Sequence, residues 1–198
     1  MTSVSVVGLS GILVAAFVGL PGDGGGSAEH AASSTTIAAD QELLTDIVGL
    51  VTDKRRYPVP EAAASKFLAP FSPVKRDEAT PESLVYSGER SPGVQVTLDY
   101  GKDARGAWTF EAANFYVVSS NGLTVIFQRL EEGIRAKLGD PSWTKRKKSG
   151  GAEAMSWKLG KRIKVWLARR VGTVPNQQRS IDHVEITIGE ATPEATTD

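Results

Sequence analysis

The chain has 198 residues, of which 40% are hydrophobic and 23% are charged, and its formal net charge at pH 7 is zero. This composition is typical of one globular domain and excludes a largely disordered chain. The chain has no cysteine, which excludes disulfide bonds, thiol nucleophiles and cysteine metal ligands.

The N-terminal segment is hydrophobic and uncharged through Gly22, and no lysine or arginine occurs before Lys54. Its apolar run, residues 4–20, lies at the short edge of what spans a bilayer. A helix-breaking proline and small residues follow, which is typical of a secretory signal, although the usual basic start is missing. We therefore predict a signal peptide at residues 1–28 and an exported protein, periplasmic or extracellular. An uncleaved membrane anchor at residues 4–20 and a buried hydrophobic helix are the alternatives.

Residues 29–36 are a polar spacer, and a helical pattern begins after them. Apolar side chains return at three- and four-residue steps, which predicts an amphipathic helix. They are Ile37, Leu43, Leu44, Ile47, Leu50 and Val51. Basic residues fill the last turn and two prolines end it, and a second short helix extends the helical segment to residue 68. Residues 69–82 contain three prolines and are predicted to be an extended linker.

A two-residue period replaces the helical one from Ser83 onward, and it predicts a β-hairpin up to residue 118. The clearest strand alternates polar residues with apolar Val94, Val96, Leu98 and Tyr100. The alternation slips near Ala112 and Ala113, which predicts a β-bulge. One side of the hairpin is therefore expected to be buried and the other to face water.

The longest apolar stripe at helical spacing follows the hairpin and predicts the main helix. Ser120 or Asn121 is the expected N-cap, and Gly139 followed by Pro141 marks the end. The stripe comprises Leu123, Ile126, Phe127, Leu130, Ile134 and Leu138. Three or four strands come next, at about 143–148, 153–158, 162–171 and 181–188. Residues 190–198 form an acidic tail that we expect to be disordered.

The order of these elements predicts an α+β fold in a single domain, residues 37–189. We expect an antiparallel sheet of about five to six strands, with one main helix packed on one face and an N-terminal helical segment. Long runs of one element type joined by short links favour this antiparallel arrangement over a parallel one.

Residues able to support catalysis are few, and none of them forms a recognised motif. His183 is expected on the polar side of the last strand, exposed at the surface, and alternation points Asp182 in the opposite direction. Asp99 and Glu111 are candidates for a carboxylate pair, but no spacing rule places them at the separation that glycoside hydrolysis requires. We therefore assign no catalytic residue, no metal ligand and no cofactor.

The segment between Thr144 and Arg170 is strongly basic. It contains ten lysines and arginines and a single acid, Glu153, so its net charge is +9. If Trp157 pairs with Ile163 and Lys158 with Arg162, the apolar side chains of both strands share one buried face. The opposite face then carries the hypothetical ligand-binding residues Lys158, Arg162, Lys164, Trp166 and Arg170.

The predicted function is binding rather than catalysis. Cations around an exposed tryptophan suit a polyanion, so we expect a non-enzymatic exported module that engages an anionic surface ligand or a protein partner of the cell envelope. Nucleic acid is not expected as a partner, and a membrane only through an uncleaved N-terminal segment. Two alternatives stay open. The basic side chains could simply solvate a sheet face, or the protein is an envelope hydrolase whose site combines strand carboxylates with His183.

Overall fold

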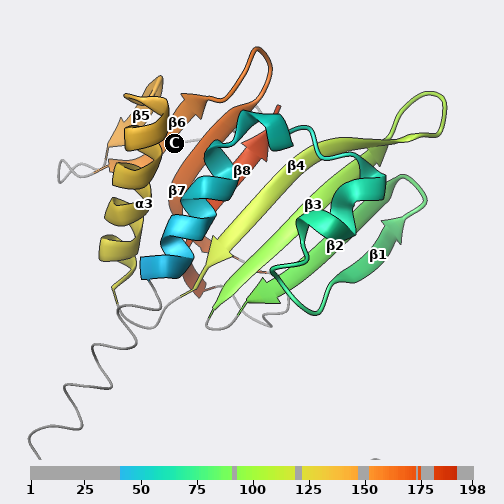
Figure 1. The fold of residues 1–198 in the computed structure, drawn as a ribbon, viewed down its shortest axis with the longest axis horizontal. Coiled ribbons are helices and arrows are strands. Elements are labelled where there is room, and N and C mark those ends of the chain that lie inside the picture. The colour runs from blue at the N-terminus through green and yellow to red at the C-terminus, as the bar shows by residue number, and fades with distance from the viewer. Residues whose placement is uncertain are drawn as a thin grey trace, which may run out of the picture. The chain divides into compact units, whose positions relative to one another are not determined.

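The computed structural model describes residues 41–90, 93–118, 122–146, 152–172, 174 and 181–190. Eight strands in these ranges form one antiparallel sheet, in the order β1-β2-β3-β4-β8-β7-β6-β5 (Figure 1). Their bounds are β1 Lys75–Thr80, β2 Ser83–Arg90, β3 Val94–Lys102, β4 Trp108–Val117, β5 Trp143–Arg146, β6 Ala152–Lys158, β7 Lys164–Gly172 and β8 Ile181–Gly189. The last strand, β8, lies in the middle of the sheet because it pairs with β4 on one side and with β7 on the other.

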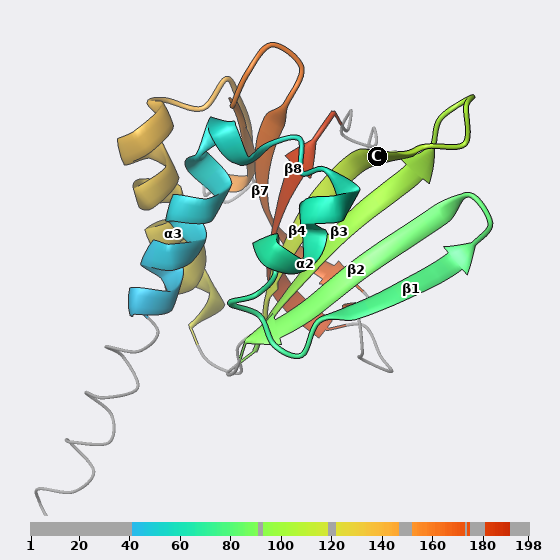
Figure 2. The ribbon, with the colours of Figure 1, turned by 45° about the vertical axis from the view of Figure 1, so that its right-hand side comes forward.

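Helical segments cover one face of this sheet (Figures 1 and 2). Residues 41–52 are helical and form the first of them. The others are η1 Lys54–Arg56, η2 Glu61–Ala63, α2 Ala64–Phe67 and α3 Leu123–Leu138. The first helix packs on α3, where a β-carbon at Gly133 would lie only 2.8 Å from a methyl group of Val48. This close approach of two helices requires the small residue at position 133.

The hydrophobic core lies between the helices and the sheet. Alternation sends every second strand residue to the covered side, and in β3 and β4 these side chains are buried. They are Val94, Val96, Leu98, Tyr100, Ala113, Phe115 and Val117. Fully buried side chains of both long helices pack on the same cluster, Ile47 and Val51 from the first helix and Leu130 and Ile134 from α3.

The predicted fold class is wrong in its strand number and in its single main helix. The sheet has eight strands rather than five to six, and it is antiparallel, as expected. Strand β1 was missed because all six of its side chains are exposed, so no apolar alternation marks it within residues 69–82. A single main helix was expected because α3 has the longest apolar stripe, but the first helix buries Ile47 and Val51 just as fully.

The register of the β6–β7 hairpin differs from the predicted one by two residues. Trp157 pairs with Val165 rather than with Ile163, and Lys158 pairs with Lys164 rather than with Arg162. The backbone N–H groups of Leu159 and Gly160 donate to the Ile163 carbonyl, at 2.9 and 3.2 Å, and close a longer loop. Because a shift of two preserves the alternation, the inward and outward sides of both strands remain as predicted.

The bulge in β4 lies at Glu111, one residue before the predicted position. Asp99 pairs with Ala112 and Tyr100 with Phe110, so Glu111 is the extra residue. Its carboxylate extends across Gly101, where a β-carbon would collide with it. Since Gly101 and Asp99 point to the same side of β3, the bulge places Glu111 and Asp99 on one face of the sheet.

Helix α3 buries Leu123, Phe127, Leu130 and Ile134, which confirms the predicted stripe. Gly139 follows its last residue with a positive φ of 80°, which favours glycine. The predicted N-cap residues, Ser120 and Asn121, lie outside the described residues, and Gly122 directly precedes the helix.

The predicted signal peptide, the spacer and residues 191–198 of the acidic tail also lie outside the described residues. Within the described ranges, no helix combines the length and apolar character needed to cross a membrane.

Candidate binding face

The side of the sheet opposite the helices is covered by no helix of the described residues, and we call it the open face (Figure 2). Residues paired across strands point to the same side, so the register shows which side chains share this face. One row of directly paired residues crosses seven strands: Ser87, Thr97, Asn114, Thr187, Trp166, Ser156 and Trp143. The row joins a polar region on β3, β4 and β8 to a region on β5–β7 that contains two tryptophans.

Four of the five predicted ligand-binding residues lie on the open face. Lys158 ends β6, and Lys164, Trp166 and Arg170 alternate along β7. Arg162 does not join them, because the longer loop between β6 and β7 takes it to the end of the sheet. Trp143 of β5, which the sequence analysis did not single out, takes a place on this face. We call Trp143, Lys158, Lys164, Trp166 and Arg170 the basic tryptophan patch.

Trp166 is the centre of this patch. Its ring and that of Trp143 pack edge to face, with centroids 5.6 Å apart, and the Lys164 ammonium lies 5.4 Å from the Trp166 centroid. The indole N–H of Trp166 is buried and has no acceptor among the described residues. Trp143 is 43% exposed. The pair therefore presents aromatic surface beside a cation, an arrangement suited to stacking and cation–π contacts.

The cations of the patch differ in whether a carboxylate forms an ion pair with them. Arg170 forms an ion pair with Glu185 of β8, with Nε 2.8 Å from Oε2. Lys158 and Lys164 are direct neighbours across the β6–β7 pair, and neither has an ion-pair partner among the residues that the structure describes. Like charges opposite one another repel. An anion placed between these two lysines would relieve that repulsion.

A chain of polar side chains crosses the open face beside the patch. The Asn114 amide donates to Asp99 at 2.7 Å and lies 3.3 Å from the Thr97 hydroxyl. The Thr187 hydroxyl donates to the side-chain oxygen Oδ1 of Asn114 at 2.9 Å and lies 3.3 Å from a carboxylate oxygen of Glu185. The sequence analysis missed this network, although polar residues at every second position of β3, β4 and β8 were its signal.

The carboxyl group of Asp99 accepts a hydrogen bond within this network. Burial raises the pKa of Asp99 and the charge of Glu111 adds to the effect, while hydrogen bonds from Thr97 and Asn114 oppose it. Burial also raises the pKa of Tyr116, on the same face, to about 12. Asp99 is therefore a half-buried carboxyl held by two hydrogen bonds beside a second carboxyl group.

His183 lies on the open face, as the alternation predicts, but the prediction that it is exposed is wrong. It is 2% exposed, because it packs against the ring of Tyr116 at a centroid distance of 5.8 Å and pairs with Arg170 on β7. Its Nδ1 lies 3.0 Å from the Ile181 carbonyl oxygen. Asp182 points away from His183 and forms an ion pair with Arg169.

Among the described residues, no three histidine or carboxylate side chains lie close enough together to hold a metal ion. Comparison with protein-family models, with curated proteins and with solved structures gave no match.

Proposed function

We propose that this chain is a non-enzymatic binding module that engages an anionic polysaccharide of the cell envelope through the basic tryptophan patch. The packed Trp143–Trp166 pair with Lys164 beside its ring is the observation that carries the proposal. Sugar rings stack on tryptophan faces, and their carboxylate, sulfate or phosphate groups pair with Lys158 and Lys164. The envelope location depends on the predicted export signal.

The polar network supports a sugar as the ligand. Thr187 is paired directly with Trp166, and Asn114 is paired directly with Thr187. A ring stacked on Trp166 therefore lies beside the Thr187 hydroxyl on the neighbouring strand β8, and the Asn114 amide lies one strand further, on β4. Polar groups that fix orientation beside an aromatic platform are typical of sites for polar ring ligands.

A lipid surface fits this face less well. The large hydrophobic side chains that are exposed in the described part of the chain are Val125, Trp143 and Val171. Val125 belongs to α3 on the covered side, so the open face offers few apolar groups for insertion into a bilayer. Membrane binding through an amphipathic surface depends on buried apolar area as well as on charge.

Heparin retention of the full chain at low and at moderate salt tests the proposal. We expect wild type to be retained at low salt and released as salt rises, because screening weakens the attraction to exposed lysines. Lys158→Gln combined with Lys164→Gln should elute earlier, and Trp143→Ala should bind more weakly without losing the salt dependence. The control Lys66→Gln with Lys137→Gln removes the same charge from exposed positions on α2 and α3.

The outcome that contradicts the proposal is equal weakening by the patch variant and the charge-matched control, or no retention of wild type at low salt. Retention on phosphatidylglycerol vesicles but not on heparin would replace the polysaccharide with a lipid surface. Heparin retention and vesicle retention are measured on the same four proteins: wild type, the two patch variants and the control.

A hydrolase is the second candidate, and it rests on the raised pKa of Asp99 beside Glu111. Glycoside hydrolysis uses two carboxyl groups whose different surroundings give them different roles. The test is release of reducing ends from the polysaccharide that the patch binds. Turnover by wild type that is lost in both Asp99→Asn and Glu111→Gln would favour the hydrolase, whereas binding without turnover favours the module.

A further inference from the structure

A cavity of about 640 Å³ opens on the covered side, at the end of the sheet that carries the β6–β7 loop. Its wall is formed by residues 54–61, the beginning of β4 and the loop Leu159–Ile163, together with Glu190 after the end of β8. It shares no residue with the basic tryptophan patch, although it contains Arg162, which the sequence analysis had grouped with that patch. Its volume lies within the range of about 300–1,000 Å³ that is typical of small-molecule sites.

The wall of this cavity is mainly aromatic and aliphatic. Tyr57, Trp108 and Phe110 line it, together with Val59 and Ile163. The rings of Tyr57 and Phe110 are in contact, with centroids 6.1 Å apart. Such a wall suits a ring or a short hydrocarbon chain, because apolar ligand surface is removed from water there.

Tyr57 carries a polar group that its surroundings leave unsatisfied. The residue is 7% exposed, and its hydroxyl is buried with no hydrogen-bond partner among the described residues. Burial raises the pKa of Tyr57, so the hydroxyl is a neutral donor. Buried hydroxyls are rarely left unpaired in folded proteins. Because Tyr57 lines the cavity, a ligand oxygen that reaches this hydroxyl would supply the missing acceptor.

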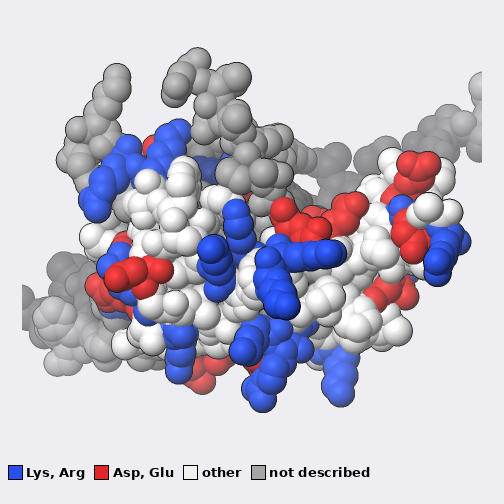
Figure 3. Space-filling model, turned by 90° about the horizontal axis from the view of Figure 1, so that it is seen from above, with Lys and Arg blue, Asp and Glu red and all other residues white. Residues whose placement is uncertain are grey.

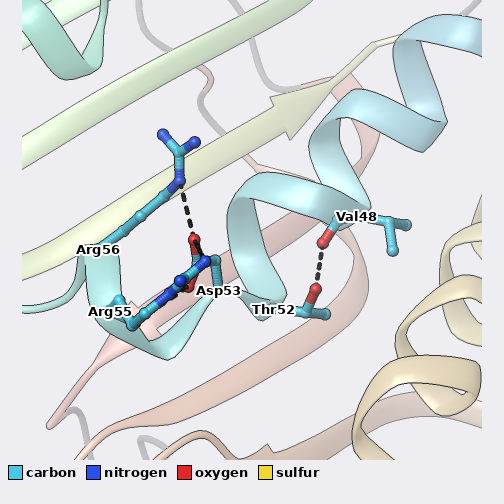
Figure 4. A network of polar contacts seen from close by, with 5 residues as sticks. All are labelled: Val48, Thr52, Asp53, Arg55 and Arg56. Carbon is cyan, nitrogen blue, oxygen red and sulfur yellow. Dashed lines mark hydrogen bonds and ion pairs between the residues drawn. The ribbon is translucent and has the colours of Figure 1, made fainter.

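The segment before Tyr57 is held by Asp53 (Figure 4). Its carboxylate accepts hydrogen bonds from the backbone N–H of Arg55 at 3.1 Å and from the Arg55 Nε at 3.0 Å, and Nε of Arg56 lies 3.5 Å away. The hydrogen bond from Arg55 lowers the pKa of Asp53. This turn places Lys54 and Tyr57, on either side of the two arginines, in the cavity wall.

The rim of the cavity is positively charged. Lys54, Lys161 and Arg162 line it, against the acids Glu61 and Glu190. The Glu61 carboxylate is already engaged, since it accepts a hydrogen bond from the Tyr86 hydroxyl. Viewed from this end of the molecule, lysine and arginine side chains gather across the middle of the surface, with acidic groups beside them (Figure 3). An anionic group at the mouth of the cavity would therefore be attracted.

We propose that this cavity binds a small amphipathic anion, a ring or short chain that carries one carboxylate, sulfonate or phosphate. The apolar part lies against Tyr57, Trp108 and Phe110, and the anionic group lies at Lys161 and Arg162. The site is independent of the polysaccharide proposal, because it lies on the other side of the sheet and uses none of the patch residues.

Two fluorescent probes with the same ring system test the charge requirement on the full chain. Anilinonaphthalene sulfonate is anionic, and phenylnaphthylamine is its neutral counterpart. We expect saturable binding of the sulfonate, displaced by decanoate or naphthoate. Lys161→Gln combined with Arg162→Gln should lower the affinity for the sulfonate by about tenfold and leave the affinity for the neutral probe unchanged. Only the sulfonate forms charged hydrogen bonds with these two side chains, so only its binding loses them.

The matched control is Lys66→Gln combined with Lys137→Gln, which also removes two exposed cations and lies outside both the cavity and the patch. It should leave the affinity for both probes unchanged. The proposal is overturned if the folded wild type shows no saturable binding, or if the control weakens the sulfonate as much as the loop variant does.

Two further variants locate the probe. Tyr57→Phe keeps the ring and removes only the hydroxyl, so we expect unchanged thermal stability and about fivefold weaker binding of the sulfonate. Trp108→Ala should lower the affinity for both probes, and Trp143→Ala on the open face should leave both affinities unchanged. Full affinity in both Tyr57→Phe and Trp108→Ala, or a loss in Trp143→Ala alone, would place the probe outside the cavity and overturn the proposal.

Discussion

The two faces of this sheet are built from the same strands but hold different kinds of residue. The covered face buries aliphatic and aromatic side chains against two helices, and Val96, Leu98 and Phe115 there have no exposed surface. The open face buries polar ones, including Thr97, Asn114 and His183. The covered face therefore supplies most of the folding free energy through apolar burial. The open face depends on hydrogen bonds that hold polar side chains in fixed positions.

The largest effect is expected on the covered face, from Leu130→Asp in α3. Leu130 has no exposed surface, and an unpaired buried carboxylate should cost several kcal/mol, enough to unfold a domain of ordinary stability. Val125→Asp on the same helix is the matched control, because Val125 is 49% exposed. Thermal unfolding measures both. A cooperative transition for Leu130→Asp close to that of wild type would show that this side chain is not in the core.

On the open face, Asn114→Ala should cost less, about 1–3 kcal/mol, because it leaves Asp99 and Thr187 without their partner. Urea unfolding measures the difference. Thr109→Ala is a suitable control, because the Thr109 hydroxyl donates to a backbone carbonyl at an exposed position of the same strand. If both substitutions cost the same few tenths of a kcal/mol, the polar network does not stabilise the open face.

His183→Ala is expected to cost about 1 kcal/mol, through lost packing against Tyr116. An exposed histidine, as predicted from the sequence, would have had almost no effect. The same urea experiment measures it, with the half-buried Ser87 of β2, on the same face, as the control in Ser87→Ala. A stability for His183→Ala within error of wild type would mean that the histidine contributes no packing.

Alternation predicts the side of a strand on which a residue lies, but not its exposure or its partner. It put Lys158, Lys164, Trp166 and Arg170 on one face, and the structure agrees. A two-residue shift of the β6–β7 register leaves that alternation unchanged, so the pattern could not distinguish Arg162 from Lys164 as the partner of Lys158. The hydrogen bonds that close the loop at the Ile163 carbonyl make Lys164 the partner of Lys158.

The weakest predictions concern features that arise from tertiary contacts. Strand β1 has no buried side chain, and β5 has only four residues, so neither carries a strong periodic signal. The burial of His183 comes from its neighbours on β4 and β7 rather than from its own strand. The cavity at Tyr57 combines segments that are about fifty residues apart in the sequence, and no local pattern could have revealed it.

The smallest expected effect is a pH dependence that belongs to the open face alone. The pKa of Asp99 is raised in the folded state, mainly by burial. A raised pKa means that the folded protein binds the proton more tightly than the unfolded chain, so this group favours folding at low pH. That contribution is lost as pH rises through the folded pKa. Compared with wild type, Asp99→Asn should therefore have a higher unfolding free energy at about pH 7 relative to its own value at about pH 4. Asp103→Asn, at an exposed turn, controls for the loss of one carboxylate. The unfolding free energies of both variants could instead change with pH in the same way as that of wild type. That result would mean that burial of Asp99 does not perturb its titration.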